Sequence, residues 1–204
     1  MTDTYRTLNH LSLGEYKEKG SKFIAYAKAV YSIDEVKAFL EEVRNEHPKA
    51  RHHCYAYRLG LDKRKNYRAN DDGEPSGSAG KPILGQIDSM ELSNIMSIVV
   101  RYFGGTKLGV TGLIRAYKTA TRDAFEKGNI AHKQVKNYYQ LAFNYHEMNS
   151  VMKLMKLEKI PILAQTYNNN NCLLNISIRQ SESEHLLNSL SKITSLNCTF
   201  THAA

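Results

Sequence analysis

The last third of this 204-residue chain changes cleanly from a strand periodicity to a helical one and back. From Tyr139 to Tyr145 apolar residues occupy every second position, which is typical of a strand with one buried face. The apolar spacing then becomes helical over residues 148–155, and Pro161 prevents that helix from continuing. This segment therefore predicts a strand followed by an amphipathic helix.

The remaining residues add two strands, a helix and a last strand. Residues 162–167 and 172–178 indicate two strands joined by a turn of four asparagines at 168–171. Ser181-x-x-Glu184 is a capping box that predicts a second helix, and residues 196–200 alternate in a final strand. We therefore predict a β-α-β-β-α-β domain, the order of a ferredoxin-like fold.

The first half of the chain predicts an α+β domain with a mostly antiparallel sheet. Strand-like segments cover residues 21–31, 52–59 and 94–103. One helix is predicted from the capping box Ser32-x-x-Glu35, and another over residues 112–127. The fold class is therefore α+β in both halves of the chain.

The two patterns imply two domains, at residues 1–131 and 137–204, joined by a linker within residues 128–137. No apolar run approaches the roughly 20 residues of a membrane-spanning helix. The polar N-terminus lacks the apolar core of a signal peptide. The three cysteines are widely spaced and do not suggest a disulfide framework. We therefore expect a cytoplasmic protein with no membrane partner.

Positive charge predominates, because 28 lysines and arginines outnumber 20 aspartates and glutamates and give a net charge of +8. A basic chain suits a polyanionic partner, since each neutralised phosphate releases counterions. The same balance occurs in proteins that bind no nucleic acid, so charge alone leaves both alternatives open.

Two glycine-rich segments, residues 70–82 and 99–109, lie between the predicted strands and helices of the first half. Neither matches the Walker pattern GxxxxGK[ST] or the dinucleotide pattern GxGxxG. Gly104, Gly105 and Gly109 would nevertheless allow the backbone to approach a ligand closely. The second segment is therefore a candidate binding loop.

The helix after this loop would begin at Thr111 or Gly112. Its N-terminus would offer unpaired N–H groups and the positive end of the helix dipole, which favour an anion. Arg115, Lys118 and Arg122 follow at helical spacing and would form one basic stripe. The alternative is a solvated helix face next to turns that packing requires.

Three segments resemble the motifs of a known family, the Impact/YigZ family. Two resemble its signatures: Asp71-Asp-Gly-Glu-Pro-Ser-Gly-Ser-Ala-Gly-Lys-Pro-Ile83 and Val99-Val-Arg-Tyr-Phe-Gly-Gly-Thr-Lys-Leu-Gly109. Glu18-Lys-Gly-Ser-Lys-Phe-Ile24 resembles its N-terminal motif. The resemblance implies an N-terminal domain of the ribosomal protein S5 domain 2 type. It also implies a C-terminal ferredoxin-like domain similar to those of elongation factor G.

The same resemblance implies a role in translation, because eukaryotic members regulate translation by binding a partner of the kinase that phosphorylates an initiation factor. We therefore expect a translation-associated regulatory protein that binds ribosomal or other structured RNA, or a translation-factor partner. The expected anion-binding residues lie on the basic glycine-rich face: Arg101, Gly104, Gly105, Lys107, Gly109, Arg115, Lys118 and Arg122. A flanking basic loop would consist of Lys63, Arg64, Lys65 and Arg68, for which a solvated turn is the alternative.

A hydrolase acting on a small phosphorylated or peptide substrate is an alternative function. Asp71, Asp72 or Glu74 could act as a general base, and Ser76 or Ser78 as a nucleophile. The acidic run lacks the spacing of a calcium loop. It could equally cap a helix or pair with the basic loop. We therefore expect a binding protein rather than an enzyme.

A metal site and a protein-binding surface are the remaining alternatives. His52 and Cys54 would share one strand face while His53 would not, and two ligands do not complete a structural zinc site. No metal or other cofactor is therefore expected. An adaptor that docks through Tyr102 and Phe103 predicts weak salt dependence of binding, whereas RNA binding predicts a steep one.

Overall fold

The computed structural model describes residues 3–62, 65–168 and 171–203 of the chain. They form two compact units. The N-terminal unit is Tyr5–Lys133, and the C-terminal unit comprises the described parts of Met1–Thr4 and Gln134–Ala204. Among the described residues, no helix is both long enough and apolar enough to span a bilayer.

The segment expected to be a linker, residues 128–137, contains a strand. β7 (Ile130–Gln134) pairs with β1 (Thr4–Leu8) in a two-stranded sheet. The Asn9 N–H donates to the Asn129 carbonyl at 3.0 Å beside this pair. A strand this short, with a partner about 120 residues away in sequence, leaves no local periodic signal.

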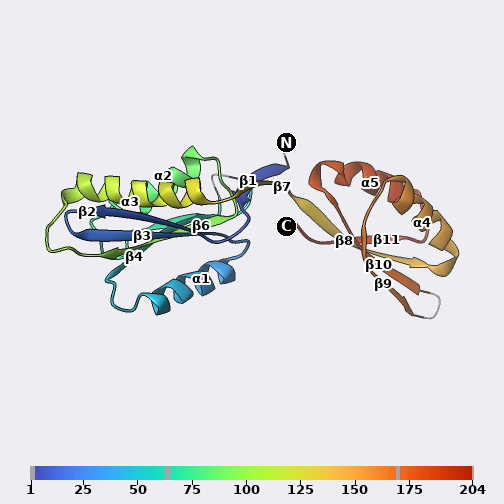
Figure 1. Ribbon diagram of the computed structural model, residues 1–204. Coiled ribbons are helices and arrows are strands. Elements are labelled where there is room, and N and C mark those ends of the chain that lie inside the picture. Colours follow the sequence, from blue (N-terminus) through green and yellow to red (C-terminus); the bar gives the residue numbers. More distant parts are fainter. Residues whose placement is uncertain (1–2, 63–64, 169–170, 204) are drawn as a thin grey trace. The chain divides into compact units, whose positions relative to one another are not determined.

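The N-terminal unit is built on a five-stranded antiparallel sheet with the strand order β2-β3-β6-β4-β5. Its strands are β2 (Ser12–Glu18), β3 (Ser21–Ala29), β4 (His52–Arg58), β5 (Tyr67–Asn70) and β6 (Ile95–Tyr102). Helices α2 (Gly80–Ser89) and α3 (Gly109–Lys127) cover one face, and α1 (Ile33–Glu46) covers the other (Figure 1). The predicted antiparallel sheet is confirmed.

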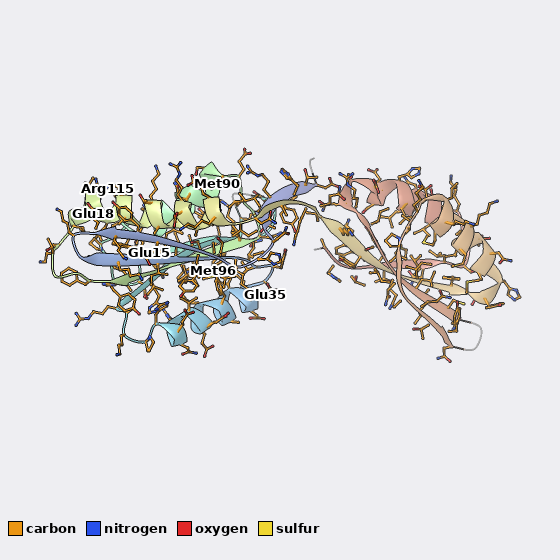
Figure 2. All side chains as sticks on the ribbon, viewed as in Figure 1. Glu15, Glu18, Glu35, Met90, Met96 and Arg115 are labelled. Carbon is orange, nitrogen blue, oxygen red and sulfur yellow. The ribbon has the colours of Figure 1, made fainter. Side chains whose placement is uncertain are left out.

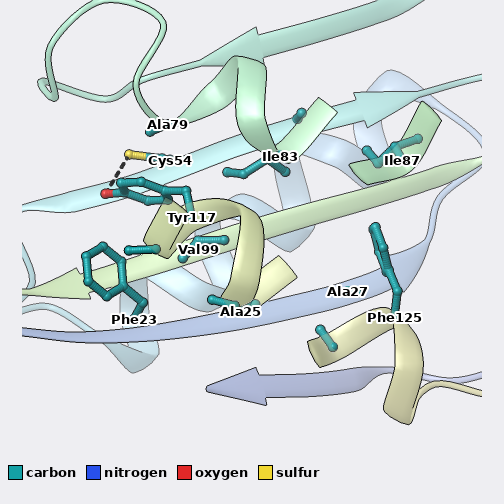
Figure 3. Packing of buried hydrophobic residues seen from close by; sticks show 14 of the residues in the cluster. Phe23, Ala25, Ala27, Cys54, Ala79, Ile83, Ile87, Val99, Tyr117 and Phe125 are labelled. Carbon is teal, nitrogen blue, oxygen red and sulfur yellow. Dashed lines mark hydrogen bonds between the residues drawn. The ribbon is translucent and has the colours of Figure 1, made fainter. Parts of the chain in front are cut away.

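Both faces of this sheet are buried, so its central strand has no alternating pattern. Every residue of β6 from Ile95 to Arg101 is buried, because helices lie above and below it. Phe23 and Tyr117 belong to the core cluster on the α2–α3 face (Figure 3). Phe39 and Ile98 belong to a second cluster on the α1 face. The unit is therefore three layers thick, with helices on both sides of the sheet.

The start of α1 agrees with the sequence prediction, and that of α3 does not. Ser32 Oγ accepts a hydrogen bond from the Glu35 N–H at 3.1 Å, which is the expected cap. α3 begins at Gly109, before the predicted start at Thr111 or Gly112. Glycine has a low intrinsic helix propensity, so the sequence does not indicate a helix at Gly109. In the folded protein, packing overrides this preference and the helix begins there.

The C-terminal unit has the predicted β-α-β-β-α-β order. Its elements are β8 (Lys136–Asn144), α4 (Met148–Leu157), β9 (Ile162–Asn168), β10 (Asn171–Arg179), α5 (Ser183–Leu190) and β11 (Asn197–Ala203). The sheet is antiparallel with the order β11-β8-β10-β9, and both helices lie on one of its faces (Figure 1). Tyr139, Leu141 and Phe143 point into the core beneath the helices, where Leu186 is also buried.

The predicted capping box at Ser181 is wrong. Ser181 lies in a short 3-10 turn, Gln180–Glu182, and α5 begins without a side-chain cap. Ser181 Oγ instead donates to Asp3 Oδ2 at 2.7 Å, and the Arg179 guanidinium binds both oxygens of the same carboxylate. The hydrogen bonds from Arg179 and Ser181 hold the pKa of Asp3 well below its usual range. The Ser181 hydroxyl group therefore binds the Asp3 carboxylate, which is distant in sequence, and does not cap the helix.

The close packing of α3 on β2 predicts that Gly14 cannot be replaced. A Cβ atom on Gly14 would lie 2.3 Å from the Ala124 nitrogen and 2.5 Å from the Ala120 oxygen, both of them backbone atoms. Overpacking of this kind typically costs about 1–3 kcal/mol, so we expect Gly14→Ala to lower the free energy of unfolding in urea by that amount.

Gly85→Ala is the matched control. Gly85 is exposed in α2, and a Cβ atom there would meet nothing within 4 Å. Because alanine favours a helix over glycine, this variant should be more stable than the parent by about 0.5–1 kcal/mol. Equal effects of the two substitutions would contradict the packing of α3 on β2.

Candidate functional site

The three family-like segments meet at one end of the N-terminal unit. A Cβ atom on Gly104 would lie 1.9 Å from the Gly20 carbonyl carbon, and the Gly104 N–H donates to Ser21 Oγ at 3.1 Å. Gly20 itself has a φ of +78°, in the left-handed region that favours glycine. The turn between β2 and β3 and the loop after β6 therefore touch through backbone, with no space for a side chain.

A buried ion pair joins the two glycine-rich segments. Arg101 Nη1, on β6, lies 2.6 Å from Glu74 Oε1, and their side chains are only 8% and 4% exposed. The Arg101 guanidinium also lies 5.5 Å from the ring centroids of both Phe23 and Phe103. Arg101 was expected to contact phosphate at the surface, and the structure places it instead in the interior beside Glu74.

A tyrosine of helix α3 forms a hydrogen bond to this ion pair. Tyr117 donates its hydroxyl hydrogen to Glu74 Oε1 at 2.8 Å, and Cys54 Sγ lies 3.3 Å from the Tyr117 oxygen (Figure 3). Burial raises the pKa of Tyr117 and of Cys54. Both groups therefore stay protonated at neutral pH, and Cys54 is not available as a thiolate nucleophile.

Asp71 organises the start of α2. Its carboxylate accepts the N–H groups of Gly77 at 2.8 Å, Ala79 at 3.0 Å and Gly80 at 2.8 Å. Burial tends to raise the pKa of Asp71, but these three hydrogen bonds outweigh it and hold the pKa below its ordinary value. An ionised carboxylate here satisfies N–H groups that the helix leaves unpaired.

Asp72 connects the same loop to α1 and β4. Its carboxylate accepts the backbone N–H of His53 at 2.7 Å and Arg44 Nη2 at 3.2 Å. Its carbonyl oxygen, which can only accept, takes a hydrogen bond from His52 Nδ1 at 2.8 Å. Burial lowers the pKa of His53, so its ring is neutral at pH 7. Asp72 therefore holds the loop against two neighbouring elements.

Four of the five candidate catalytic residues have structural contacts, and the fifth, Ser76, is exposed. Asp71, Asp72 and Glu74 each bind groups of the protein itself, and Ser78 Oγ donates to the Pro75 carbonyl at 2.6 Å. Within residues 3–62, 65–168 and 171–203, no group of three or more His, Cys, Asp or Glu side chains could hold a metal ion.

The basic residues of α3 divide into paired and unpaired ones. Arg115 forms an ion pair with Glu18 (Figure 2), and Arg122 pairs with Glu126 at 2.6 Å. Lys118 is exposed and has no ion-pair partner in the described part of the chain. Of the four basic residues of α3, Lys118 therefore has the free charge, because Lys127 pairs with Asp123 at 2.6 Å.

The loop before α3 is open, and the flanking basic loop is described only in part. Gly105 and Gly109 have φ values of +88° and +72°, and Lys107 between them is exposed without an ion-pair partner among the described residues. Lys65 pairs with Asp62 at 3.5 Å and Arg68 is exposed on β5. The other two positions of the flanking loop, 63 and 64, lie outside the described residues: Lys63 and Arg64.

A cavity of about 410 Å³ that no sequence pattern predicts lies beside this loop. Its lining residues come from the start of β4 and the end of β6: Lys49, Arg51, His52, Arg101, Tyr102 and Phe103. His52 and Arg101 are partners across these two strands, which brings the residues before one next to the residues after the other. The only sequence signal for this cavity was the basic pair Lys49 and Arg51 just before a predicted strand. The register of β4 and β6 was needed to locate this pair beside Phe103.

The buried ion pair predicts that Glu74 is essential for stability. Glu74→Gln removes the carboxylate charge and leaves the Arg101 guanidinium unpaired in the interior, a loss that typically costs about 3–5 kcal/mol. We expect a decrease of that size in the free energy of unfolding measured in urea. Glu126→Gln, which removes the exposed partner of Arg122, should change it by no more than about 0.5 kcal/mol. Similar losses in both variants would contradict the role of the buried pair.

Asp71 predicts a pH-dependent effect. In Asp71→Asn the amide oxygen can still accept from Ala79 and Gly80, but the amide nitrogen would face the Gly77 N–H, donor against donor. We expect a loss of about 1–2 kcal/mol at pH 7. The folded pKa lies below 3.8, so the carboxylate stabilises the fold above pH 3.8, and this contribution disappears as the pH falls through the folded value.

Urea titrations from pH 7 to pH 3 would test this. The difference between Asp71→Asn and the parent should be constant at higher pH and shrink below pH 3.8. Asp34→Asn is the control, because the Asp34 side chain is 91% exposed. A difference that stays constant down to pH 3 would contradict an ionised, hydrogen-bonded Asp71.

Comparison with known proteins supports the family resemblance. The family model described as Impact N-terminal domain matches residues 19–125, more than half of the chain. IMPACT family member YigZ of Escherichia coli (strain K12) is 38% identical over 138 residues, 67% of this chain and 68% of that protein. An IMPACT family member of Haemophilus influenzae is 34% identical over 170 residues, 82% of either chain. The crystal structure of a hypothetical protein aligns with a TM-score of 0.74 at 29% identity, covering 99% of both chains. This chain therefore belongs to the IMPACT family.

Proposed function

We propose that this protein acts in translation by binding structured RNA, ribosomal RNA in the first place, through the basic glycine-rich face of its N-terminal unit. The contacts come from Lys107 in the loop, Lys118 on α3, and the open backbone between Gly104 and Gly109. The family resemblance supports a translation-associated role, because eukaryotic members of the family regulate translation. A cytoplasmic location follows from that role.

This proposal rests on the observation that carboxylates around the loop are paired with arginines. Glu18 pairs with Arg115, Glu74 with Arg101, and Asp72 with Arg44, so an arginine neutralises each of these three carboxylates. The Asp71 carboxylate is held by backbone N–H groups at the start of α2. Lys107 and Lys118 have no such partner in the described residues. The exposed charge beside the loop is therefore positive, which suits the phosphates of a nucleic acid.

We also propose that the two units have the folds that the resemblance implies. The C-terminal strand order β11-β8-β10-β9, with both helices on one face, supports a ferredoxin-like domain similar to those of elongation factor G. The N-terminal unit is assigned to the ribosomal protein S5 domain 2 type on the resemblance of its motifs. Both types of domain occur in the translation machinery.

A translation-factor protein is the second candidate partner, because apolar side chains are also exposed near the loop. Phe103 is 57% exposed, and Val110 and Ile114 are exposed one turn apart on α3. A protein docked on these residues would bind with weak salt dependence. A hydrolase function is not proposed, because the carboxylates of Asp71, Asp72 and Glu74 are held by the protein itself.

Co-sedimentation with purified ribosomes between about 50 and 200 mM salt would test RNA binding. The variant Lys107→Glu/Lys118→Glu is preferable to changes at Arg115 and Arg122, because the lysines have no ion pair to lose. We expect binding that weakens steeply with salt. The variant should bind more weakly, with a slope of log K against log salt that is smaller by about two.

Lys153→Glu/Lys156→Glu is the matched control, since it makes the same change of charge at two exposed positions of α4 in the C-terminal unit. It should bind like the parent. Equal losses of ribosome binding in the two variants would mean that net charge, and not the basic face, determines binding, and would contradict the proposed site. Absence of binding at the lowest salt would contradict the proposal.

A further inference from the structure

The cavity at the ends of β4 and β6 is large enough to hold a small ligand. Its volume of about 410 Å³ lies within the range usual for such sites, about 300–1,000 Å³. It combines cationic side chains at one part of its lining, Lys49 and Arg51, with the aromatic rings of Tyr102 and Phe103. Cations beside an aromatic ring are the groups that bind a phosphate and a base together.

The cationic part of the lining is free to bind an anion. Lys49 and Arg51 are exposed, and neither has an ion-pair partner among the described residues. Arg101, by contrast, is neutralised by Glu74. Its Nε is buried without a hydrogen-bond partner in the described part of the chain. The net charge that a ligand would meet therefore comes from Lys49 and Arg51.

The Phe103 ring contacts the buried Arg101 guanidinium and remains largely exposed. The Arg101 guanidinium lies 5.5 Å from the Phe103 ring centroid and is itself fixed by Glu74. The Phe103 side chain is nevertheless 57% exposed, a large apolar area for a residue next to a cavity. A nucleobase stacked on the Phe103 ring would cover this area without any change in the buried ion pair.

We propose that this cavity binds a nucleotide, with the phosphate on Lys49 and Arg51 and the base on Phe103. The inference goes beyond the phosphate contacts of Lys107 and Lys118, because it adds a contact to a base and uses different residues. The nucleotide is either a free mononucleotide or one unit of an RNA strand. The two sources share the phosphate and base chemistry that the cavity recognises.

The absence of tryptophan from the chain allows a direct test of stacking. Phe103→Trp introduces a single tryptophan, which can be excited selectively beside the 13 tyrosines and keeps an aromatic ring at the proposed stacking position. Fluorescence of this variant would be titrated with AMP, with a short oligoadenylate and with inorganic phosphate. Phe200→Trp is the matched control, because Phe200 is 54% exposed and lies on β11 of the C-terminal unit.

We expect the base-containing probes to quench the fluorescence of the Phe103→Trp variant with saturation and to leave that of Phe200→Trp unchanged. Inorganic phosphate should not quench the Phe103→Trp variant by itself but should compete with the nucleotide. Quenching by AMP identifies a free-nucleotide site, whereas quenching by the oligoadenylate alone identifies a site for an RNA strand. Absence of quenching by both, or equal quenching in both variants, would overturn the proposal.

Substitutions of the residues that line the cavity would measure how much each contact contributes to the binding affinity. Calorimetric titration with whichever probe binds should show about 5- to 150-fold weaker binding for Phe103→Ala, since stacking contributes about 1–3 kcal/mol. Lys49→Ala/Arg51→Ala should weaken binding about tenfold or more, because charge-assisted hydrogen bonds to phosphate are lost. Lys153→Ala/Lys156→Ala should bind like the parent, and an equal loss there would count against the cavity.

Adding Lys107→Glu/Lys118→Glu to the Phe103→Trp variant separates this proposal from that of ribosome binding. If AMP quenches the introduced tryptophan equally with and without these lysine substitutions, the cavity is a nucleotide site whether or not ribosomes bind. If ribosomes sediment with the parent while no base-containing probe quenches the Phe103→Trp variant, the basic face stands and the nucleotide site is contradicted.

Discussion

The buried ion pair between Arg101 and Glu74 is the interaction on which the arrangement of the N-terminal unit depends. A guanidinium and a carboxylate leave water at a large cost, so they are stable in the interior only when they are paired and further hydrogen-bonded. Tyr117 provides that additional bond. Because the three residues come from β6, the first glycine-rich segment and α3, satisfying one charge pair fixes three elements. The position of Phe103 follows, since its ring packs on the same guanidinium.

The C-terminal unit could be predicted from sequence because its sheet is covered on one face only. Tyr139, Leu141 and Phe143 alternate with more exposed neighbours, so the period of two is preserved. The N-terminal sheet is covered on both faces, and β6 therefore appears as a continuous apolar run. Strands β2 and β5 were missed for other reasons. Gly14 interrupts the pattern of β2 because α3 needs the space, and β5 has only four residues.

The sequence singled out the acidic residues of the first glycine-rich segment, but it could not give their contacts. Asp71, Asp72 and Glu74 were singled out as possible acids or bases, and all three instead organise the loop. The partners of Glu74 are 27 and 43 residues away, which no local pattern reveals. Lys49 and Arg51 illustrate the converse case. They had no predicted role until the register of β4 and β6 placed them beside Phe103.

The arginines and lysines around the glycine-rich loop have different roles, for a chemical reason. A planar guanidinium matches the geometry of a carboxylate, and Arg44, Arg101 and Arg115 neutralise Asp72, Glu74 and Glu18, with Arg101 alone of the three buried. On the loop and on α3, the exposed positive charge without a carboxylate partner among the described residues is left to Lys107 and Lys118, which act as hydrated point charges. A lysine face attracts any phosphate backbone and carries little sequence information. Discrimination between nucleic acid and other polyanions would then require a contact to a base, and Phe103 is the exposed aromatic residue that the buried Arg101 holds in position for it.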